Sequence, residues 1–161
     1  MAGAVSRSVL ILGVGNPLAG DDGVGVRAIE GLARAGELPG GIRLLDVGVL
    51  GMDILAWTRP DEPVVILDAV HGPGDPGTLY RFVLDEIAAP VEPPLSVHEL
   101  GIADTLHAAR LMGRPLRGTL IGVEPARIEA FTAGLSPPVA AALPALQAAA
   151  IREAELLLAG G

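Results

Sequence analysis

The sequence predicts an α/β fold built on one sheet of five strands. Short apolar runs rich in Val, Ile and Leu alternate along the chain with segments of helical periodicity, which is the pattern of a parallel sheet with crossover helices. The run 64–67 (VVIL) is apolar throughout, as expected of a central strand buried on both faces. A glycine-rich loop joins the first strand to the first helix, at the edge where open α/β sheets bind their ligands.

Composition narrows the class of protein. A length of 161 residues suggests one domain spanning 1–161, and with 50% hydrophobic but only 2% aromatic residues its core must consist of Val, Leu, Ile and Ala. The absence of cysteine excludes disulfides, thiolate metal sites and a cysteine nucleophile, and it fits a reducing compartment. The net charge of −8 argues against nucleic acid and anionic membranes as partners. Because no signal peptide or membrane span is recognised, we expect a cytoplasmic protein.

The strands are recognised as short apolar runs that end at glycine, proline or acidic residues. They are expected at 9–12, 42–45, 64–67, 78–84 and 116–123. The connection from Asp68 to the strand 78–84 is too short for a crossover helix, so this strand should pair antiparallel or lie at an edge of the sheet.

The helices are recognised by apolar residues at helical spacing and by capping signals. They are expected at 22–35, 52–57, 96–113 and 136–158. Ser96 and Glu99 have the spacing of a capping box, and Ser136 precedes a proline suited to the first helical position. Pro144 should kink the last helix or split it in two.

The loop after the first strand contains an amide, Asn16, and two adjacent acids, Asp21 and Asp22. One acid is expected to cap the following helix. Helix capping needs only one acid, so local structure does not explain the second. A dinucleotide-binding loop is the rival interpretation, but it needs a third glycine where this chain has Leu18. Two carboxylates would also repel a pyrophosphate, so we disfavour this alternative.

Acidic residues also follow three other strands, at Asp46, Asp68 and Glu124. If these strands are parallel, their carboxylates meet at one edge of the sheet, where they repel one another unless a cation or shared protons are present. His98, in the first turn of a helix, can join them, because a helix N-terminus favours the neutral imidazole that binds metals. Two carboxylates and one imidazole suit a divalent ion such as nickel or zinc.

The remaining histidines have plainer interpretations. His71 lies in a loop of Gly and Pro and is expected to be exposed, and His107 is expected to be structural. The chain lacks a Gly-x-Ser-x-Gly elbow, a His-Glu-x-x-His helix and a P-loop, so serine-hydrolase, zincin and nucleotide-hydrolase chemistry lose their usual support.

Four motifs, in this order and spacing, resemble those of the hydrogenase maturation endopeptidases: GVGNPLAGDDGVG at 13–25, DAV at 68–70, HELG at 98–101 and GVEP at 122–125. The resemblance covers nearly the whole chain. It implies a three-layer α/β/α fold with a mostly parallel five-stranded sheet. It also implies an endopeptidase that removes a C-terminal extension from the large-subunit precursor of a nickel-iron hydrogenase, after nickel has been inserted.

The resemblance assigns the metal-contacting and catalytic roles to Asp22, Asp68 and His98. Many family members have Glu at the position of Asp22, though Asp also occurs. Asp21 is then the better candidate for the helix cap. The resemblance further implies that nickel comes with the substrate and is not held tightly by the enzyme. The expected partner is the hydrogenase large-subunit precursor, and the chain is expected to be a monomer.

Two other functions stay open at this stage. The chain could be a metallohydrolase that carries its own zinc at the same three residues, or a non-catalytic checkpoint protein that binds metal without cutting. In the peptidase, either the metal or a carboxylate base could activate the attacking water.

Overall fold

The computed structural model describes residues 7–49, 53–87 and 97–160, and the side chains of residues 97–101 lie outside the described set. The strands are β1 (Val9–Val14), β2 (Ile42–Gly48), β3 (Val64–Ala69), β4 (Leu79–Val83) and β5 (Gly118–Val123). The helices are α1 (Val24–Ala35), α2 (Ile54–Trp57), α3 (Val97–Leu111) and α4 (Pro137–Ala159), with short 3₁₀ turns η1 (Gly20–Gly23) and η2 (Leu84–Glu86). In this described part of the chain, no helix combines the length and the apolar character needed to cross a membrane.

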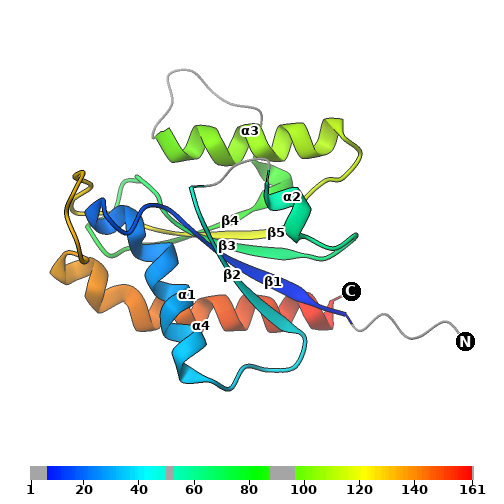
Figure 1. Ribbon diagram of the computed structural model, residues 1–161, viewed down its shortest axis with the longest axis horizontal. Coiled ribbons are helices and arrows are strands. Elements are labelled where there is room, and N and C mark those ends of the chain that lie inside the picture. Colours follow the sequence, from blue (N-terminus) through cyan, green and yellow to red (C-terminus); the bar gives the residue numbers. More distant parts are fainter. Residues whose placement is uncertain (1–6, 50–52, 88–96, 161) are drawn as a thin grey trace, which may run out of the picture.

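One five-stranded sheet organises the molecule, with the strand order β2-β1-β3-β5-β4 (Figure 1). The first four strands in this order run parallel to one another. β4 pairs antiparallel with β5, and Tyr80 lies opposite Gly122. The predictions of a mostly parallel sheet and of one antiparallel strand are therefore confirmed.

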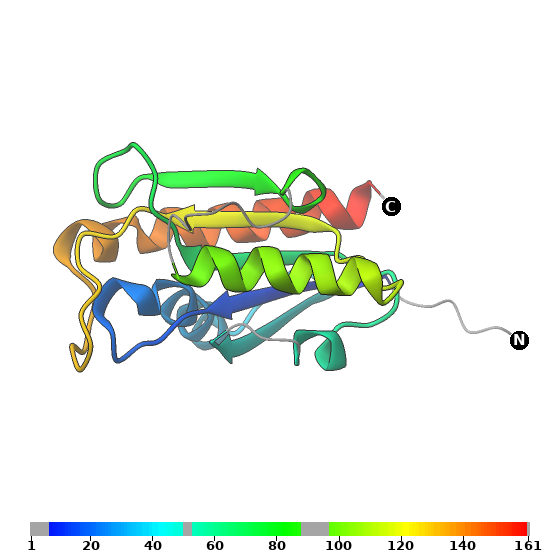
Figure 2. The ribbon, with the colours of Figure 1, turned by 90° about the horizontal axis from the view of Figure 1, so that it is seen from above.

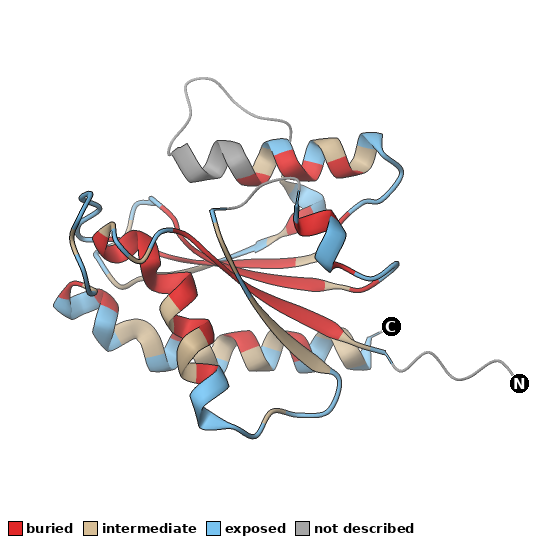
Figure 3. Cartoon of the chain, in the orientation of Figure 1, coloured by how far each residue is buried: buried red, intermediate tan, exposed pale blue. Residues whose placement is uncertain are grey.

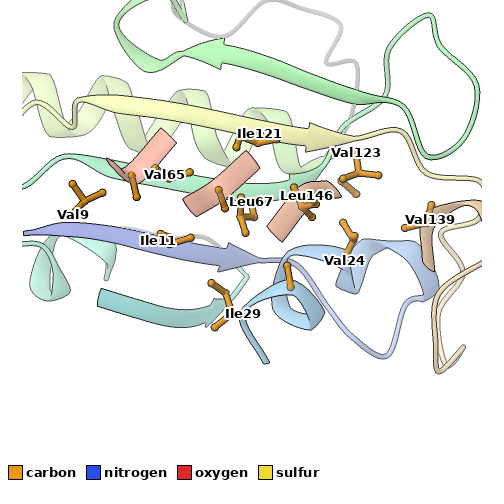
Figure 4. Packing of buried hydrophobic residues seen from close by; sticks show 14 residues of the cluster. Val9, Ile11, Val24, Ile29, Val65, Leu67, Ile121, Val123, Val139 and Leu146 are labelled. Carbon is orange, nitrogen blue, oxygen red and sulfur yellow. The ribbon is translucent and has the colours of Figure 1, made fainter. Parts of the chain in front are cut away.

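Helices cover both faces of the sheet, as two views at right angles show (Figures 1 and 2). α1 and α4 cover one face, and α2 and α3 cover the other. Successive residues of a strand point to opposite faces, so each central strand contributes to two cores. In β1, Val9 and Ile11 face α1 and α4 (Figure 4), whereas Leu10 and Leu12 face α2 and α3. The three-layer prediction is confirmed.

Burial of both faces explains why the sequences of the central strands are continuous apolar runs. Every residue of β1 and of β3 is buried, whereas β2 and β4 at the two edges are largely half-buried or exposed (Figure 3). The edge position of β4 follows from its short connection to β3, which leaves no length for a crossover helix.

Several boundaries differ from the sequence-based expectation. β1 continues to Val14 and β3 to Ala69, so Asp68 lies inside the strand and not after it. The helix expected at 22–35 starts at Val24, after the 3₁₀ turn that contains Asp22. Of the two outcomes predicted for Pro144, a kink or a split, the split does not occur, because α4 runs through Pro144 as one helix. The capping box predicted at Ser96 falls outside the described residues.

Close packing of α1 against the sheet sets the position of the loop before it. Gly25, in the first turn of α1, lies so near the sheet that a Cβ there would overlap the carbonyl oxygens of Leu67 in β3 and Val14 in β1. Only glycine permits this approach of a helix to two strands. The first turn of α1 and the preceding η1 are thereby brought to the carboxyl ends of β1 and β3.

Candidate active site

Two buried carboxylates lie at the carboxyl edge of the sheet. Asp68, in β3, is fully buried, and Asp22, in η1, is 2% exposed. The backbone N–H of Asn16 donates to Oδ2 of Asp22 (2.9 Å), and the backbone N–H of Ala69 donates to Oδ1 of Asp68 (2.8 Å). η1 packs against β3, so the two residues belong to touching elements. Removing an ionised carboxylate from water costs several kcal/mol, and carboxylate oxygens are ligands for divalent cations.

The alternation of β3 indicates which helix completes the site. Val64 and Ile66 pack in the core beneath α2 and α3, and Asp68 follows them at the same period of two. Asp68 therefore belongs to the face covered by α3. Both Figure 1 and Figure 2 place the first turn of α3 at the carboxyl ends of the parallel strands.

His98 belongs to that first turn, since α3 begins at Val97. Its side chain lies outside the described residues, so its predicted role as a metal ligand stays a prediction. Among the described side chains alone, no group of three His, Asp or Glu residues could hold a metal ion.

Asp21 does not cap a helix, and the sequence-based prediction is wrong on this point. Neither η1 nor α1 has a side-chain cap. Instead, the fully buried carboxylate of Asp21 accepts hydrogen bonds from the backbone N–H groups of Ala126 (2.8 Å) and Arg127 (2.9 Å). It also accepts bonds from the backbone N–H and the hydroxyl of Ser136, both at 2.7 Å. Asp21 thus joins the β1–α1 loop, which also contains Asp22, to the β5–α4 connection.

These hydrogen bonds keep Asp21 ionised. Burial alone would raise the pKa of Asp21, but the bonds from Ser136, Arg127 and Ala126 outweigh it and lower that pKa below its ordinary value. Ser136 occupies the N-cap position of α4 as predicted, followed by Pro137, but its hydroxyl donates to Asp21 and caps no helix N–H group.

Comparison with known proteins decides the family. The family model described as hydrogenase maturation protease matches residues 26–153. The chain belongs to this family. It is 39% identical to the hydrogenase 2 maturation protease of Escherichia coli, over 90% of this chain and 91% of that protein. It is also 39% identical to the hydrogenase expression/formation protein HupD of Rhodobacter capsulatus, over 90% of this chain and 70% of that protein.

Solved structures agree with this assignment. The hydrogenase maturating endopeptidase HybD from E. coli superposes with a TM-score of 0.76 at 35% identity, covering 91% of this chain and 93% of that one. A solution structure of an endopeptidase from E. coli gives a TM-score of 0.79 at 37% identity, with the same coverage. The chain is therefore a hydrogenase maturation endopeptidase.

In this maturation protease, two other polar residues expected near the sheet edge form local hydrogen bonds. Asp46 is exposed and accepts a hydrogen bond from the backbone N–H of Gly48 (2.9 Å). Asn16 is exposed as well, and its side-chain oxygen accepts the backbone N–H of Leu18 (2.9 Å). Both side chains stabilise their own turns, and neither joins the two buried carboxylates.

Glu124 is buried and holds the β3–β4 connection. Its Oε2 accepts hydrogen bonds from the backbone N–H of Gly72 and from the hydroxyl of Tyr80 (2.8 Å). The half-exposed ring of His71 lies 3.6 Å from the other carboxylate oxygen. The expectation that His71 is exposed is confirmed. His107 is exposed on α3 and takes no part in the core.

Sequence reasoning missed the role of Asp21 because its partners are 105 to 115 positions away along the chain. One signal was available: two adjacent acids exceed what a single cap requires. This surplus indicated a second task without indicating which acid performs it.

Proposed function

We propose that Asp22, Asp68 and His98 form the site at which this protease contacts the nickel of its substrate. The substrate is the large-subunit precursor of a nickel-iron hydrogenase, from which the protease removes the C-terminal extension. The observation that supports this site most strongly is the pair of buried carboxylates on touching elements at the carboxyl edge. Two carboxylates and an imidazole form a donor set that suits a first-row divalent ion.

The three residues differ in how firmly the fold holds them. Asp68 sits in a strand that is paired on both sides, with β1 and with β5. Asp22 sits in a 3₁₀ turn, which the hydrogen bond from Asn16 and the four bonds to Asp21 hold in place. His98 belongs to the first turn of a helix on the same face of the sheet as Asp68. These segments meet only through the tertiary fold.

Such a site binds a cation well when the cation brings further ligands of its own. The chain has no cysteine to hold a borderline metal tightly, and its proposed ligands come from three separate segments. The precursor's metal centre supplies the missing ligands, so nickel is part of the substrate and reports that metal insertion is complete. A carboxylate that is not engaged by the cation can accept the proton of the water that attacks the scissile peptide.

We also propose that the protease acts in the cytoplasm and as a monomer. The cysteine-free composition fits a reducing compartment, and one chain supplies all three proposed ligands.

The test is cleavage of nickel-loaded precursor by purified variants, followed by the mass of the product. We expect Asp68→Ala and His98→Gln to abolish cleavage and to keep the folded helix and strand content of the wild type. Asp22→Asn should lower activity by more than about 100-fold, because removing even a residue that supports a metal ligand costs 10- to 100-fold. Asp22→Glu should be tolerated, since many members of the family have Glu there.

Other results would contradict the proposal. Normal cleavage by His98→Gln would remove His98 from the site. Tightly held, stoichiometric zinc in protein purified without chelator would favour a metallohydrolase that carries its own ion. Binding of the nickel-loaded precursor without any change in its mass would favour a checkpoint protein.

A further inference from the structure

The β5–α4 connection holds a phenylalanine side chain almost completely in solvent. Phe131 is 97% exposed, although the chain has only two Phe residues and four aromatic residues in total. Two further large apolar side chains near it are exposed, Leu18 at 61% and Ile128 at 43%. A single exposed apolar residue needs no explanation, whereas a group of them beside a site does.

The backbone of Phe131 adopts an unfavourable conformation. Its φ is +59°, in the left-handed region where the Cβ of an L-residue crowds the neighbouring carbonyl oxygen. A bulky non-glycine residue persists there when the surrounding structure imposes it, and such strain gathers at functional positions. Fully exposed, the ring gains no packing energy within the described residues that would offset this strain.

Hydrogen bonds fix the segment that displays the ring. The backbone N–H of Thr132 donates to the carbonyl of Leu18 (3.0 Å), and the backbone N–H of Gly20 donates to the carbonyl of Thr132 (2.8 Å). The backbone N–H of Asp21 donates to the carbonyl of Arg127 (2.9 Å). The backbone N–H groups of Ala126 and Ser136 donate to the carboxylate of Asp21, which adds further hydrogen bonds between the same two segments. The ring is therefore presented by an ordered loop.

The same hydrogen bonds place the segment that carries Phe131 beside the β1–α1 loop, which contains Asp22. They join the Phe131 segment to residues 18–21, which directly precede Asp22. Figures 1 and 2 both show the β5–α4 connection lying alongside the β1–α1 loop at the carboxyl end of the sheet. We call Leu18, Ile128 and Phe131 the apolar rim of the site.

We propose that the apolar rim docks the folded body of the precursor, with the Phe131 ring inserted into an apolar pocket of that partner. This inference rests on the proposed function, because it assigns a recognition surface to the same substrate. A protein substrate whose extension is cut at the Asp22–Asp68 edge must cover the surface that continues from it. Aromatic side chains that enter a partner's pocket supply most of the affinity at such interfaces.

The charge near the rim fits a protein partner. Arg127 and Glu129, the exposed charged residues between the end of β5 and α4, cancel each other. The exposed charges of this connection therefore sum to zero in a chain whose formal net charge is −8, and by themselves they repel neither an acidic nor a basic partner.

The test compares Phe131→Asn with the wild type in two assays. Asparagine tolerates the left-handed conformation, so the variant loses the ring and also the strain. We expect its urea midpoint to equal or exceed that of the wild type. We expect its dissociation constant for immobilised nickel-loaded precursor to rise tenfold or more. In cleavage, the loss should fall mainly on KM, with a smaller effect on kcat.

A matched control separates docking from a general loss of apolar surface. Leu111, at the end of α3, is 77% exposed and lies at the opposite end of that helix from its first turn. Leu111→Asn should leave both the dissociation constant and KM at wild-type values.

Three results would overturn the inference. The first is a dissociation constant of Phe131→Asn equal to that of the wild type, and the second is an equal loss in Leu111→Asn. The third is a fall in kcat with unchanged KM, which would place Phe131 in the chemistry. The proposed function is tested separately, by cleavage with the Asp22, Asp68 and His98 variants, so its failure can be told apart from a failure of docking by Phe131.

Discussion

Two adjacent aspartates in one turn have different tasks. Among the described residues, Asp22 accepts a hydrogen bond from the backbone N–H of Asn16 in its own loop, whereas Asp21 accepts four bonds from a segment more than 100 positions away. Helix-capping rules use local spacing and therefore predicted that one of these acids was a cap. The donors to Asp21 come from tertiary contacts, which local rules cannot anticipate. The family resemblance, not the spacing, separated the two acids.

Asp21→Asn should destabilise the protein, contrary to what a capping role would predict. Oδ1 accepts one backbone N–H, and Oδ2 accepts two backbone N–H groups and a hydroxyl. Either orientation of an amide therefore places its NH₂ against a backbone donor. We expect the free energy of unfolding in urea to fall by about 1–3 kcal/mol, the usual cost of leaving a buried polar group unsatisfied.

Asp46→Asn is the matched control, because Asp46 is an exposed acid with one local hydrogen bond. It should change stability by less than about 0.5 kcal/mol, as surface substitutions usually do. Equal unfolding midpoints for Asp21→Asn and Asp46→Asn would show that the Asp21 hydrogen bonds contribute nothing to stability.

At the scale of elements, most of the fold could be predicted, because hydrophobic patterning sets it. Five apolar runs became five strands, and the short connection after Asp68 correctly predicted the antiparallel strand. The errors lie at element ends, where local signals compete with tertiary contacts. β1 and β3 each extend two residues beyond their apolar runs, because pairing with neighbouring strands continues through Gly13 and Asp68. α4 tolerates Pro144 within one helix.

The approach of α1 to the sheet gives a prediction about glycine. In Gly25→Ala the added methyl group meets backbone oxygens of β1 and β3, which cannot move aside without disturbing the sheet. We expect a loss of about 1–3 kcal/mol in unfolding free energy, the typical cost of overpacking. Cleavage of precursor should also fall, because Asp22 is displaced together with η1.

Gly31→Ala on the same helix is the control. There the new methyl group meets only the end of the flexible Gln147 side chain, and alanine is the better helix former. Stability should stay within about 1 kcal/mol of the wild type. A Gly25→Ala protein as stable as Gly31→Ala would mean that the close packing of α1 is not required.

The edge strand β4 is tied to α4 by an ion pair whose effect depends on pH. Nε of Arg81 donates to Glu153 (2.7 Å), and the hydroxyl of Thr119 in β5 donates to the same carboxylate (3.0 Å). The bond from Arg81 lowers the pKa of Glu153 below its ordinary value of 4.5; partial burial opposes this, and Thr119 adds to it. Because the folded-state pKa is lowered, this stabilisation is present above about pH 4.5 and is lost as the pH falls through the folded-state value.

Glu153→Gln should therefore be less stable than the wild type at neutral pH by about 1 kcal/mol, since Arg81 is half-exposed and the pair is screened. The difference should shrink below about pH 4.5 and disappear once Glu153 is protonated in the folded wild type. Urea unfolding at a series of pH values measures it. A difference that stays constant down to pH 3 would mean that packing, and not charge, accounts for the effect.

At the scale of the whole molecule, parallel topology collects polar groups from distant parts of the chain at one edge. The sequence located Asp68 through the apolar run before it, and strand alternation assigns this residue to the face covered by α3, whose first turn contains His98. The sequence alone could not predict which acids belong to the candidate site, because the direction of a side chain near the end of a strand depends on the loop that follows. Asp46 and Glu124 follow apolar runs of the sequence as Asp68 does, yet each accepts a hydrogen bond from a backbone N–H nearby, that of Gly48 or of Gly72.

The most direct test of the account compares cleavage of nickel-loaded and nickel-free precursor under identical conditions, read from the mass of the large subunit. The three proposed ligands come from separate segments and include no cysteine, so we expect the site to depend on ligands brought by the substrate's metal. We therefore expect the extension to be removed from the nickel-loaded precursor alone. Equal cleavage of both precursors would contradict the claim that Asp22, Asp68 and His98 recognise nickel, although the chain would still be a peptidase.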